Sequence, residues 1–263
     1  MQDRVVVITG ASAGIGAALA EAVGARGGRP VLVARREREL HEVAARSGKQ
    51  ALAVPGDVTR RDDVNRVARA AIDRFGAIDV WVNNAGRGIT RMVSELTDDD
   101  LDEMILVNAK SALYGMQAVL PHFRERGRGH IINVSSLLAR LPMAPFRSAY
   151  AASKHALAAL TANLRMELRG PHPDIHVSSV HPGIVATEFG SNARHGGIDS
   201  RQMPGAQSAV EVAEVIASVI EHPRADVYTR PGMQQMVAGY FAAKDMGLAE
   251  LQPPFMTANP APK

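Results

Sequence analysis

A tyrosine and a lysine stand four positions apart at Tyr150 and Lys154, a spacing that puts both side chains on one face of a helix. A free phenol has a pKa of about 10 and is a poor base at neutral pH. A unit positive charge about 4 Å away, at an effective dielectric of about 20, favours the phenolate by roughly 4 kcal/mol. Ser136, just after the apolar run His130–Val134, adds a hydroxyl that can polarise a substrate oxygen. The pattern predicts acid–base chemistry, although a tyrosine near a helix start is by itself more often a packing residue.

Three glycines, Gly10, Gly14 and Gly16, lie between the β-branched run Val5–Ile8 and an alanine-rich segment that continues through Ala25. This order is typical of a strand, a glycine turn and a helix. Without side chains in the turn, the backbone can approach a pyrophosphate held at the helix N-terminus. The turn alone is weak evidence, because a tight strand-to-helix connection that binds no ligand uses the same glycines.

The residues after a second apolar run, Pro30–Ala34, bear on the choice of nucleotide. Position 34 is where a carboxylate would bind the adenosine ribose of NAD, but the chain has Ala34 followed by Arg35 and Arg36. An arginine there forms charge-assisted hydrogen bonds to a 2′-phosphate, and Ser12 in the glycine turn can add a hydroxyl. NADP(H) is therefore favoured over NAD. The alternative is that the two arginines begin a solvated helix, which the charged continuation favours more for Arg36 than for Arg35.

Apolar runs alternate with helical stretches along the chain. Further strands are expected at Ala51–Val54, Val80–Val82, His130–Val134 and His176–His181, and helices near 61–75, 98–124, 150–169 and 207–222. This alternation predicts an α/β fold, a single-domain, doubly wound, Rossmann-type and mostly parallel sheet of about seven strands with helices on both faces. We expect residues 1–250 to form this domain, 188–206 to be a mobile substrate loop or lid, and 251–263 to be an irregular tail.

The composition excludes several classes of function. The 263 residues include no cysteine, which rules out disulfides, thiolate metal sites and cysteine nucleophiles. The net charge is +3, and the basic residues do not form the aromatic-interleaved patch expected of a nucleic-acid-binding protein. No apolar run is long enough to span a membrane and the N-terminus leads directly into a strand, so a cytoplasmic protein is expected. The nine histidines show no zinc-site spacing, and no catalytic metal is expected.

The chain resembles the short-chain dehydrogenase/reductase family in several separated motifs that occur in order from Thr9 to about Thr187. They are Thr9-Gly10-x-x-x-Gly14-Ile15-Gly16, Asp57-Val58, Asn83-Asn84-Ala85-Gly86, Asn108, Ser136, Tyr150-x-x-x-Lys154 and His181-Pro182-Gly183-Ile184-Val185-Ala186-Thr187. The resemblance implies catalytic roles for Asn108, Ser136, Tyr150 and Lys154. It implies that Lys154 also binds the nicotinamide ribose and that Asn108 helps to hold a water beside the lysine.

The resemblance also implies where the cofactor lies. Asp57 and Val58 would contact adenine, and Thr187 with nearby backbone would bind the nicotinamide carboxamide, although Thr187 could instead be a helix N-cap. The expected cofactor-binding residues are Gly10, Ser12, Ala13, Gly14, Ile15, Gly16, Arg35, Arg36, Asp57, Val58, Asn84, Ala85, Gly86, Tyr150, Lys154, Pro182, Gly183, Ile184, Val185 and Thr187.

One spacing departs from the family pattern. Ser136 and Tyr150 are one position further apart than in many family members, and the segment between them contains Pro142 and Pro145. The loop can absorb the extra residue by bulging. The alternative is that Ser135 supplies the functional hydroxyl.

Apolar side chains gather in the loops expected to face the nicotinamide. Leu137, Leu138, Met143, Phe146 and Phe189 are the expected substrate-contacting residues, with Ile184 nearby. They predict a mainly apolar cleft, although loop hydrophobes are as often simply packing residues. The leading hypothesis is reduction of a small or medium apolar ketone or aldehyde by NADPH, or the reverse alcohol oxidation.

Two other functions stay open at this point. One is an NAD-dependent alcohol dehydrogenase of the same fold, and the other is a nucleotide-sensing protein without catalysis. The family resemblance and the apolar faces of the helices near 98–124 and 150–169 also predict a homodimer or homotetramer packed through them.

Overall fold

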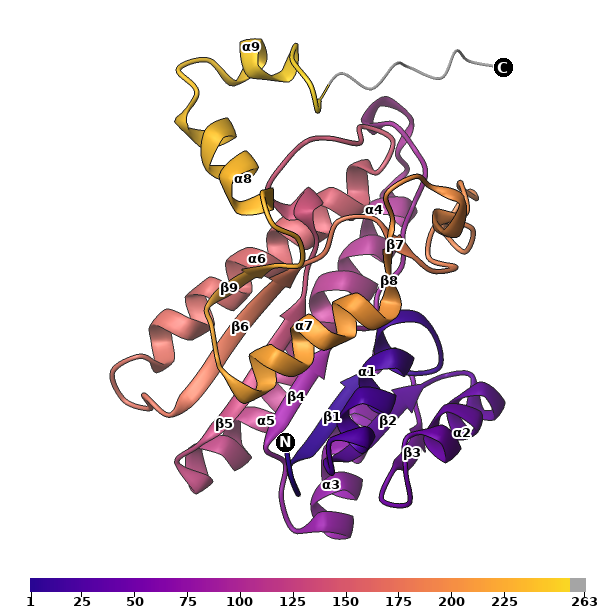
Figure 1. Cartoon of the computed structure of the whole chain (residues 1–263), viewed down its shortest axis with the longest axis vertical. Helices are drawn as coiled ribbons and strands as arrows, with labels where there is room; N and C mark the ends of the chain where they lie inside the picture. Colours follow the sequence, from indigo (N-terminus) through magenta and orange to yellow (C-terminus); the bar gives the residue numbers. More distant parts are fainter. Residues whose placement is uncertain (256–263) are drawn as a thin grey trace.

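The structure is a computed structural model that describes residues 1–255. Its centre is a seven-stranded parallel sheet in the order β3-β2-β1-β4-β5-β6-β9, with helices on both faces (Figure 1). The strand order reverses between β1 and β4, and ligands of such sheets bind beyond the carboxyl ends of the strands at that point. The predicted single-domain, doubly wound parallel sheet is confirmed. Of the predicted irregular tail 251–263, residues 256–263 lie outside the described residues.

The central sheet consists of β1 (Val5–Thr9), β2 (Arg29–Ala34), β3 (Leu52–Pro55), β4 (Val80–Asn83), β5 (Gly129–Val134), β6 (Ile175–His181) and β9 (Asp226–Tyr228). A separate parallel pair is formed by β7 (Val185–Ala186) and β8 (Gln207–Ser208). The helices are α1 (Gly14–Ala25), α2 (Glu37–Arg46), α3 (Arg61–Phe75), α4 (Asp98–Ile105), α5 (Ser111–Arg126), α6 (Ser148–Leu168), α7 (Ala209–Glu221), α8 (Met233–Ala242) and α9 (Met246–Glu250). Short 3-10 turns lie at Val93–Glu95, Leu137–Ala139 and Ser200–Gln202.

Alternate residues of β1 serve the two faces of the sheet. Val6 and Ile8 join the core formed with α1, α2 and α7, whereas Val5 and Val7 join the core formed with α3, α5 and α6. In Figure 1, α1 and α7 lie together in front of the sheet. Full burial of one such side chain stabilises the fold by about 1.5–3 kcal/mol. The continuous β-branched run is therefore explained by burial on both faces.

The sequence marks several helix ends. Thr97 and Ser208 each form a capping box at the start of α4 and α7, so the first backbone N–H groups of these helices are satisfied by side chains. Gly76 and Gly127 end α3 and α5 in the left-handed conformation that favours glycine.

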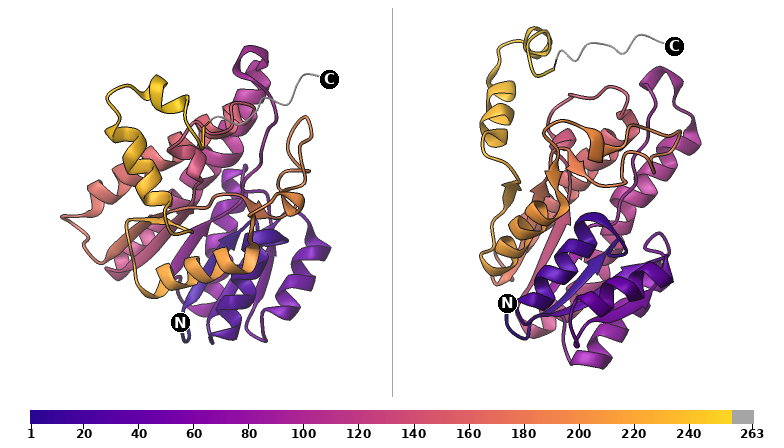
Figure 2. Two further views of the ribbon diagram at one scale, coloured as in Figure 1. Left: turned by 45° about the horizontal axis from the view of Figure 1, so that its top comes forward. Right: turned by 45° about the vertical axis from the view of Figure 1, so that its right-hand side comes forward.

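Two parts of the fold differ from the sequence prediction. The single helix expected near 98–124 is divided into α4 and α5 by a π-helical turn at Leu106–Lys110. The chain beyond α7 forms β9, α8 and α9, which the apolar pattern does not predict, because β9 and α8 each bury only one residue completely. Figure 2 shows α8 and α9, in yellow, extending away from the sheet above the carboxyl ends of its strands.

Within residues 1–255 no helix is both long enough and apolar enough to cross a membrane. The same part of the chain has no cluster of three or more His, Cys, Asp or Glu side chains placed to hold a metal ion.

Candidate active site

The turn after β1 needs its glycines for two different reasons. Gly10 and Gly14 have φ angles of 68° and 58°, in the left-handed region that side chains disfavour. A Cβ added to Gly16 would lie 2.4 Å from the carbonyl oxygen of Gly10, so no side chain fits there. The spacing G-x-x-x-G-x-G thus follows from the backbone path of the turn.

Hydrogen bonds join the glycine turn to the end of β4. The Asn84 side-chain amide donates to the Thr9 carbonyl at 2.8 Å, and the backbone N–H groups of Asn84 and Ala85 both donate to Thr9 Oγ1 at 3.0 Å. These bonds fix the two loops at the point where the strand order reverses. The residues Asn84, Ala85 and Gly86 therefore lie beside the turn, as expected for groups that contact one ligand.

The start of α1 suits an anion. Its N-cap residue, Ala13, has no capping side chain, and the first helical turn contains no acidic residue. The first N–H groups and the positive end of the helix dipole are thus not neutralised by side chains of the helix start. A Cβ on Gly14 would lie 3.2 Å from Thr187 Cγ2, so Thr187, directly after β7, packs against the same helix start. These features fit the pyrophosphate of a dinucleotide.

Of the two arginines after β2, Arg36 is the one that reaches the glycine turn. Both arginines are exposed to solvent, and the Arg36 Nη2 donates to Ser12 Oγ at 3.1 Å. The sequence favoured Arg35, but successive side chains of the extended backbone point to opposite sides, and Arg36 lies on the side of the turn. Ala34 is buried and offers no carboxylate to a ribose.

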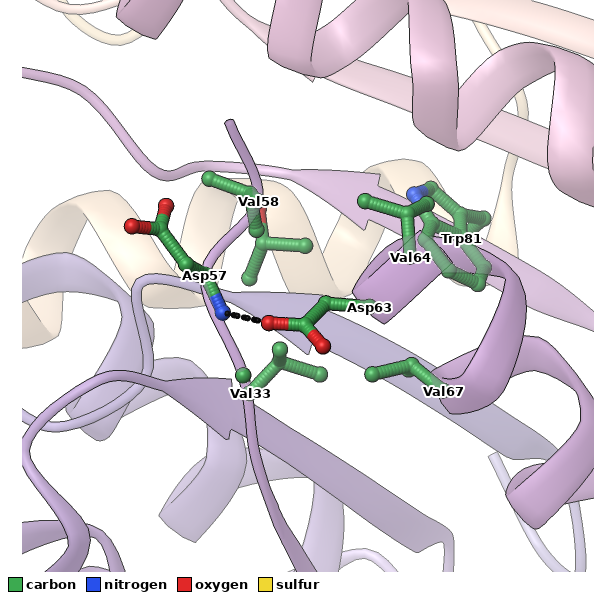
Figure 3. A pocket seen from close by; sticks show the side chains of 9 residues that line it. Val33, Asp57, Val58, Asp63, Val64, Val67 and Trp81 are labelled. Atoms are coloured by element: carbon green, nitrogen blue, oxygen red, sulfur yellow. Dashed lines mark hydrogen bonds between the residues drawn. The ribbon is translucent and has the colours of Figure 1, made fainter. Parts of the chain in front are cut away.

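Asp57 and Val58 follow β3 at the same edge of the sheet. The backbone N–H of Asp57 donates to Asp63 Oδ2 at 2.9 Å, and the Asp57 carboxylate accepts a hydrogen bond from the Thr59 hydroxyl at 2.7 Å. Figure 3 shows a narrow pocket here in which the Asp57 carboxylate points away from the apolar lining. That lining includes Val33, Val58, Val64, Val67 and Trp81.

Tyr150 and Lys154 lie on the buried face of α6, and Ser136 lies opposite them just after β5. The exposed fractions of these three residues are 8%, 3% and 7% respectively, so water reaches little of any of them. Lys154 Nζ donates to the Val134 carbonyl at 2.9 Å and lies 5.8 Å from the centre of the Tyr150 ring. Phenol, ammonium and hydroxyl therefore meet at one end of the sheet.

Burial sets the protonation of this group. It raises the pKa of Tyr150 to about 12, although the Ser136 side chain and the charge of Arg147 partly oppose the shift. It lowers the pKa of Lys154 to about 8. The sequence predicted that the lysine would bring the phenol toward neutral pH. In the protein alone the cost of desolvating the phenolate is larger than the effect of the neighbouring charges, so Tyr150 stays protonated.

Asn108 lies in the π-helical turn between α4 and α5 and is 1% exposed. Its side chain donates to the Arg87 carbonyl at 2.9 Å and accepts from the Arg87 N–H at 3.0 Å. A Cβ on Gly86 would lie 2.9 Å from Asn108 Oδ1 and 3.5 Å from Lys154 Nζ. The structure thus brings Asn108, Gly86 and Lys154 together, and a π-helical turn is a common feature of functional sites.

The two serines after β5 have different surroundings. Ser135 Oγ donates to the backbone carbonyl of Lys154 at 3.3 Å. Ser136 interacts with Tyr150 and accepts a hydrogen bond from the Leu138 N–H at 3.1 Å. The longer spacing between Ser136 and Tyr150 is absorbed by the 3-10 turn and the proline-containing loop that follow Ser136.

The end of β6 is tied to the Ser136 backbone. The Leu137 N–H donates to the Pro182 carbonyl at 2.8 Å. His181, fully buried, lies between the Ser136 carbonyl and the Asp226 carboxylate, with 3.1 Å to each. The end of β6 is therefore held in place. The segment that follows it, Pro182 to Val185, leads to Thr187 beside the glycine turn.

Comparison with known proteins identifies this arrangement. Residues 4–197 match the family model described as short chain dehydrogenase. The chain belongs to the short-chain dehydrogenase family. It is 36% identical over 236 residues to the uncharacterized oxidoreductase YxnA of Bacillus subtilis, a match that covers 87% of this chain and 65% of that protein.

Solved structures agree with this assignment. A short-chain dehydrogenase/reductase from Burkholderia phymatum in complex with NAD has a TM-score of 0.83 and 26% identity, covering 90% of this chain and 92% of its own. An alcohol dehydrogenase from Thermococcus sibiricus complexed with 5-hydroxy-NADP has a TM-score of 0.75 and 29% identity, covering 89% of this chain and 98% of its own. The chain is therefore an oxidoreductase of this family.

The apolar residues expected to contact substrate divide into two clusters in this short-chain dehydrogenase. Leu138 and Phe189 pack with Tyr150, whose ring centre lies 5.3 Å from that of Phe189. Leu137 and Met143 instead pack with side chains of α8. Phe146 is half-buried beside the Arg147 guanidinium, and Ile184 is 45% exposed.

Sequence reasoning missed two contributions to the site of this short-chain dehydrogenase. Met233 of α8 lies over the loop after β6, since a Cβ on Gly183 would be 2.5 Å from its Cε. No periodic apolar pattern marks α8, so it could not be predicted from the sequence. Arg147 was missed as well, although its place one helical turn before Tyr150 could have indicated it.

Proposed function

We propose that the protein is an NADP(H)-dependent oxidoreductase that reduces a small or medium apolar ketone or aldehyde, or oxidises the corresponding alcohol. The observation that carries this proposal is the buried meeting of Tyr150, Lys154 and Ser136 beyond the end of β5. Those three groups lie at the edge of the sheet where the glycine turn and the uncapped start of α1 suit a dinucleotide.

Within this proposal a bound nicotinamide supplies the hydride for reduction and accepts it for oxidation. Tyr150 remains protonated because burial raises its pKa to about 12, so its hydroxyl is ready to donate a proton to the substrate oxygen. The Ser136 hydroxyl donates a hydrogen bond to the same oxygen and stabilises the negative charge that develops there. The Lys154 ammonium stabilises the phenolate that is left, and Asn108 holds the backbone of Arg87, next to Gly86, through two hydrogen bonds.

The cofactor contacts follow from the same geometry. Ser12 and Arg36 would hold the 2′-phosphate, because they already contact each other over the glycine turn. Ala85 and Gly86 adjoin the turn, and Thr187 would reach the nicotinamide end from the opposite side. The cofactor of the Burkholderia phymatum neighbour is NAD and that of the Thermococcus sibiricus neighbour is an NADP derivative, so a nicotinamide cofactor is common to both.

The activity is tested by following NADPH absorbance while the purified protein is supplied with a panel of apolar ketones and aldehydes. We expect turnover of at least one member. Binding of NADPH without turnover of any member would favour the alternative, a nucleotide-sensing protein.

The choice of cofactor is tested by titrating the wild type and the Arg36→Ala variant with NADPH and NADH. We expect the wild type to prefer NADPH, and the variant to lose about tenfold in NADPH affinity with NADH unchanged. Arg38→Ala is the matched control, since Arg38 is exposed and pairs with Glu42 along the same helix. Equal affinity of the wild type for both cofactors would instead support the NAD-dependent alternative.

We also propose a homodimer or homotetramer packed through α4, α5 and α6. Leu101, Leu160 and Met166 on these helices are 41%, 37% and 63% exposed, and such apolar groups are typical of a surface that another subunit covers. Size-exclusion chromatography with light scattering gives the mass, and a monomer would exclude the proposal.

A further inference from the structure

Arg147, the residue just before α6, is a half-buried cation without an acidic partner within the described residues. Two other partly buried arginines on neighbouring loops, Arg91 and Arg194, both pair with the buried carboxylate of Asp100. Removing a cation from water is costly unless another group compensates its charge. Arg147 Nη1 donates to the Ile89 backbone carbonyl at 3.1 Å, and the described residues give Nη2 and Nε no hydrogen-bond partner. A half-buried arginine with no acidic partner and with free donors is therefore a candidate for binding a charged ligand.

A second unpaired group lies beside this guanidinium. Thr90 Oγ1 is buried and has no hydrogen-bond partner among the residues that the structure describes. A Cβ placed on Gly197 would lie 3.1 Å from Thr90 Oγ1, 3.3 Å from Arg147 Nη2 and 2.5 Å from the Gly190 carbonyl oxygen, so the hydroxyl and the guanidinium adjoin the same stretch of backbone. On the other side, a Cβ placed on Gly88 would lie 3.0 Å from Arg147 Nη1. Because both positions are glycines, the side chains next to the guanidinium are the Phe146 and Phe189 rings, which carry no charge.

The guanidinium adjoins the reacting group through one aromatic ring. The position of a Cβ on Gly88 is also 3.0 Å from Phe189 Cε1, and the Phe189 ring packs edge-on against Tyr150. Arg147, Phe189 and Tyr150 thus lie side by side in that order. Leu138 belongs to the same apolar cluster, so the wall between cation and phenol is apolar.

We propose that Arg147 and Thr90 form a binding site for a carboxylate of the substrate, which makes the substrate an oxo acid with an apolar carbon chain. A guanidinium offers a carboxylate two parallel N–H donors, and the Thr90 hydroxyl adds a third donor. Phe189 and Leu138 contact the chain between the carboxylate and the carbonyl carbon. This inference rests on the proposed function, because it extends the substrate of the same site.

The site is tested by calorimetry with two probes of equal length, hexanoate and hexanamide, on the full chain with and without NADPH. We expect hexanoate to bind at least about tenfold more tightly than hexanamide, as a charge-assisted contact predicts. Arg147→Gln should remove this preference, and Thr90→Val should weaken hexanoate by about threefold. Arg169→Gln, a change to an exposed arginine at the other end of α6, should leave both affinities unchanged.

Turnover supplies an independent readout. For 5-oxohexanoate, Arg147→Gln should raise KM at least about tenfold, and for its methyl ester KM should stay the same. Equal or unmeasurable affinity for the two probes in the wild type overturns the carboxylate site. An equal fall of kcat on acid and ester also overturns it, since Arg147 would then act only through Tyr150. If the wild type reduces neither compound, the proposed function fails, while the hexanoate result still decides the carboxylate site. If Arg147→Gln does not fold, Thr90→Val and the charge-retaining Arg147→Lys decide it.

Discussion

Around the glycine turn the contacts are short hydrogen bonds between Thr9 and the end of β4 and positions where no side chain fits, whereas around the substrate loops ion pairs and apolar side chains from distant segments add to a few backbone hydrogen bonds. Thr9 and Asn84 fix the turn with bonds of 2.8 to 3.0 Å. The loop 188–206 is attached through the Arg194 side chain, which pairs with Asp100 and Glu103 of α4, through the Arg194 backbone, which bonds Gly88 and Thr90, and through His195, which contacts Asp100. The glycine turn, which we call the nucleotide end, therefore tolerates little change in shape. The substrate loops can vary without disturbing the sheet.

The largest expected effect separates chemistry from binding. Tyr150→Phe removes the proton donor but keeps the ring that packs against Phe189. We expect kcat to fall by about 1,000-fold, within the range for general acid–base catalysis, with the affinity for NADPH nearly unchanged. Steady-state kinetics and calorimetry measure the two quantities. Turnover at the wild-type rate would remove the basis of the proposed mechanism.

The next expected effect is a loss of NADPH affinity caused by a change in the glycine turn alone. Gly16→Ala places a Cβ 2.4 Å from the Gly10 carbonyl, so the turn must move. We expect NADPH affinity to fall by about 100-fold, because misplaced backbone donors lose their contacts with the pyrophosphate. Gly239→Ala in α8 is the matched control, since nothing lies within 4 Å of its added Cβ. If both variants bind NADPH like the wild type, the glycine turn is not the cofactor cradle.

The sequence predicts the glycine turn and its surroundings better than it predicts the segments that pack over the substrate loops. The glycine turn, the doubly wound parallel sheet and the placement of Ser136, Tyr150 and Lys154 near one another were predictable, because they follow from local backbone geometry and from regular elements. Which of Arg35 and Arg36 contacts Ser12 was not predictable, since it depends on the direction in which the chain enters α2. The elements β9 and α8 were missed because they bury few residues and owe their positions to contacts with distant loops.

The pKa of Tyr150 is another property that could not be predicted from the sequence. The sequence supplies the neighbouring lysine, and from it one predicts a lowered pKa. Burial, which raises the pKa to about 12, depends on how α6 packs against the loops before and after it. Arg147, three positions before Tyr150, is a cation that partly opposes this shift.

The third expected effect is the pH dependence of the reaction at Tyr150 and Lys154. Burial lowers the pKa of Lys154 to about 8, so the ammonium is present below that pH and is lost as pH rises through it. Tyr150, with a pKa of about 12, keeps its proton over this range. We expect the reductive rate at saturating NADPH to fall by up to about tenfold between pH 8 and pH 9, since the neutral amine no longer stabilises the phenolate. A free phenol has a pKa of about 10. If the rate declined only near pH 10, the titrating group would not be Lys154.

The smallest expected effect concerns the attachment of the loop 188–206. Arg194→Met removes the guanidinium that pairs with Asp100 and Glu103, while the side-chain length is kept. A partly exposed ion pair contributes about 1 kcal/mol or less, so we expect the KM for the carbonyl substrate to rise about fivefold with NADPH affinity unchanged.

Arg201→Met is the matched control for this change. Arg201 lies in the same loop, but it pairs with Asp199 only two positions away and is 53% exposed. Its loss removes a contact within the loop and leaves the attachment to α4 intact, so substrate KM should stay at the wild-type value. If Arg194→Met weakened NADPH binding as strongly as it raised substrate KM, the loop would also be part of the nucleotide end. The glycine turn and the loop 188–206 would then depend on the same contacts and could not vary independently.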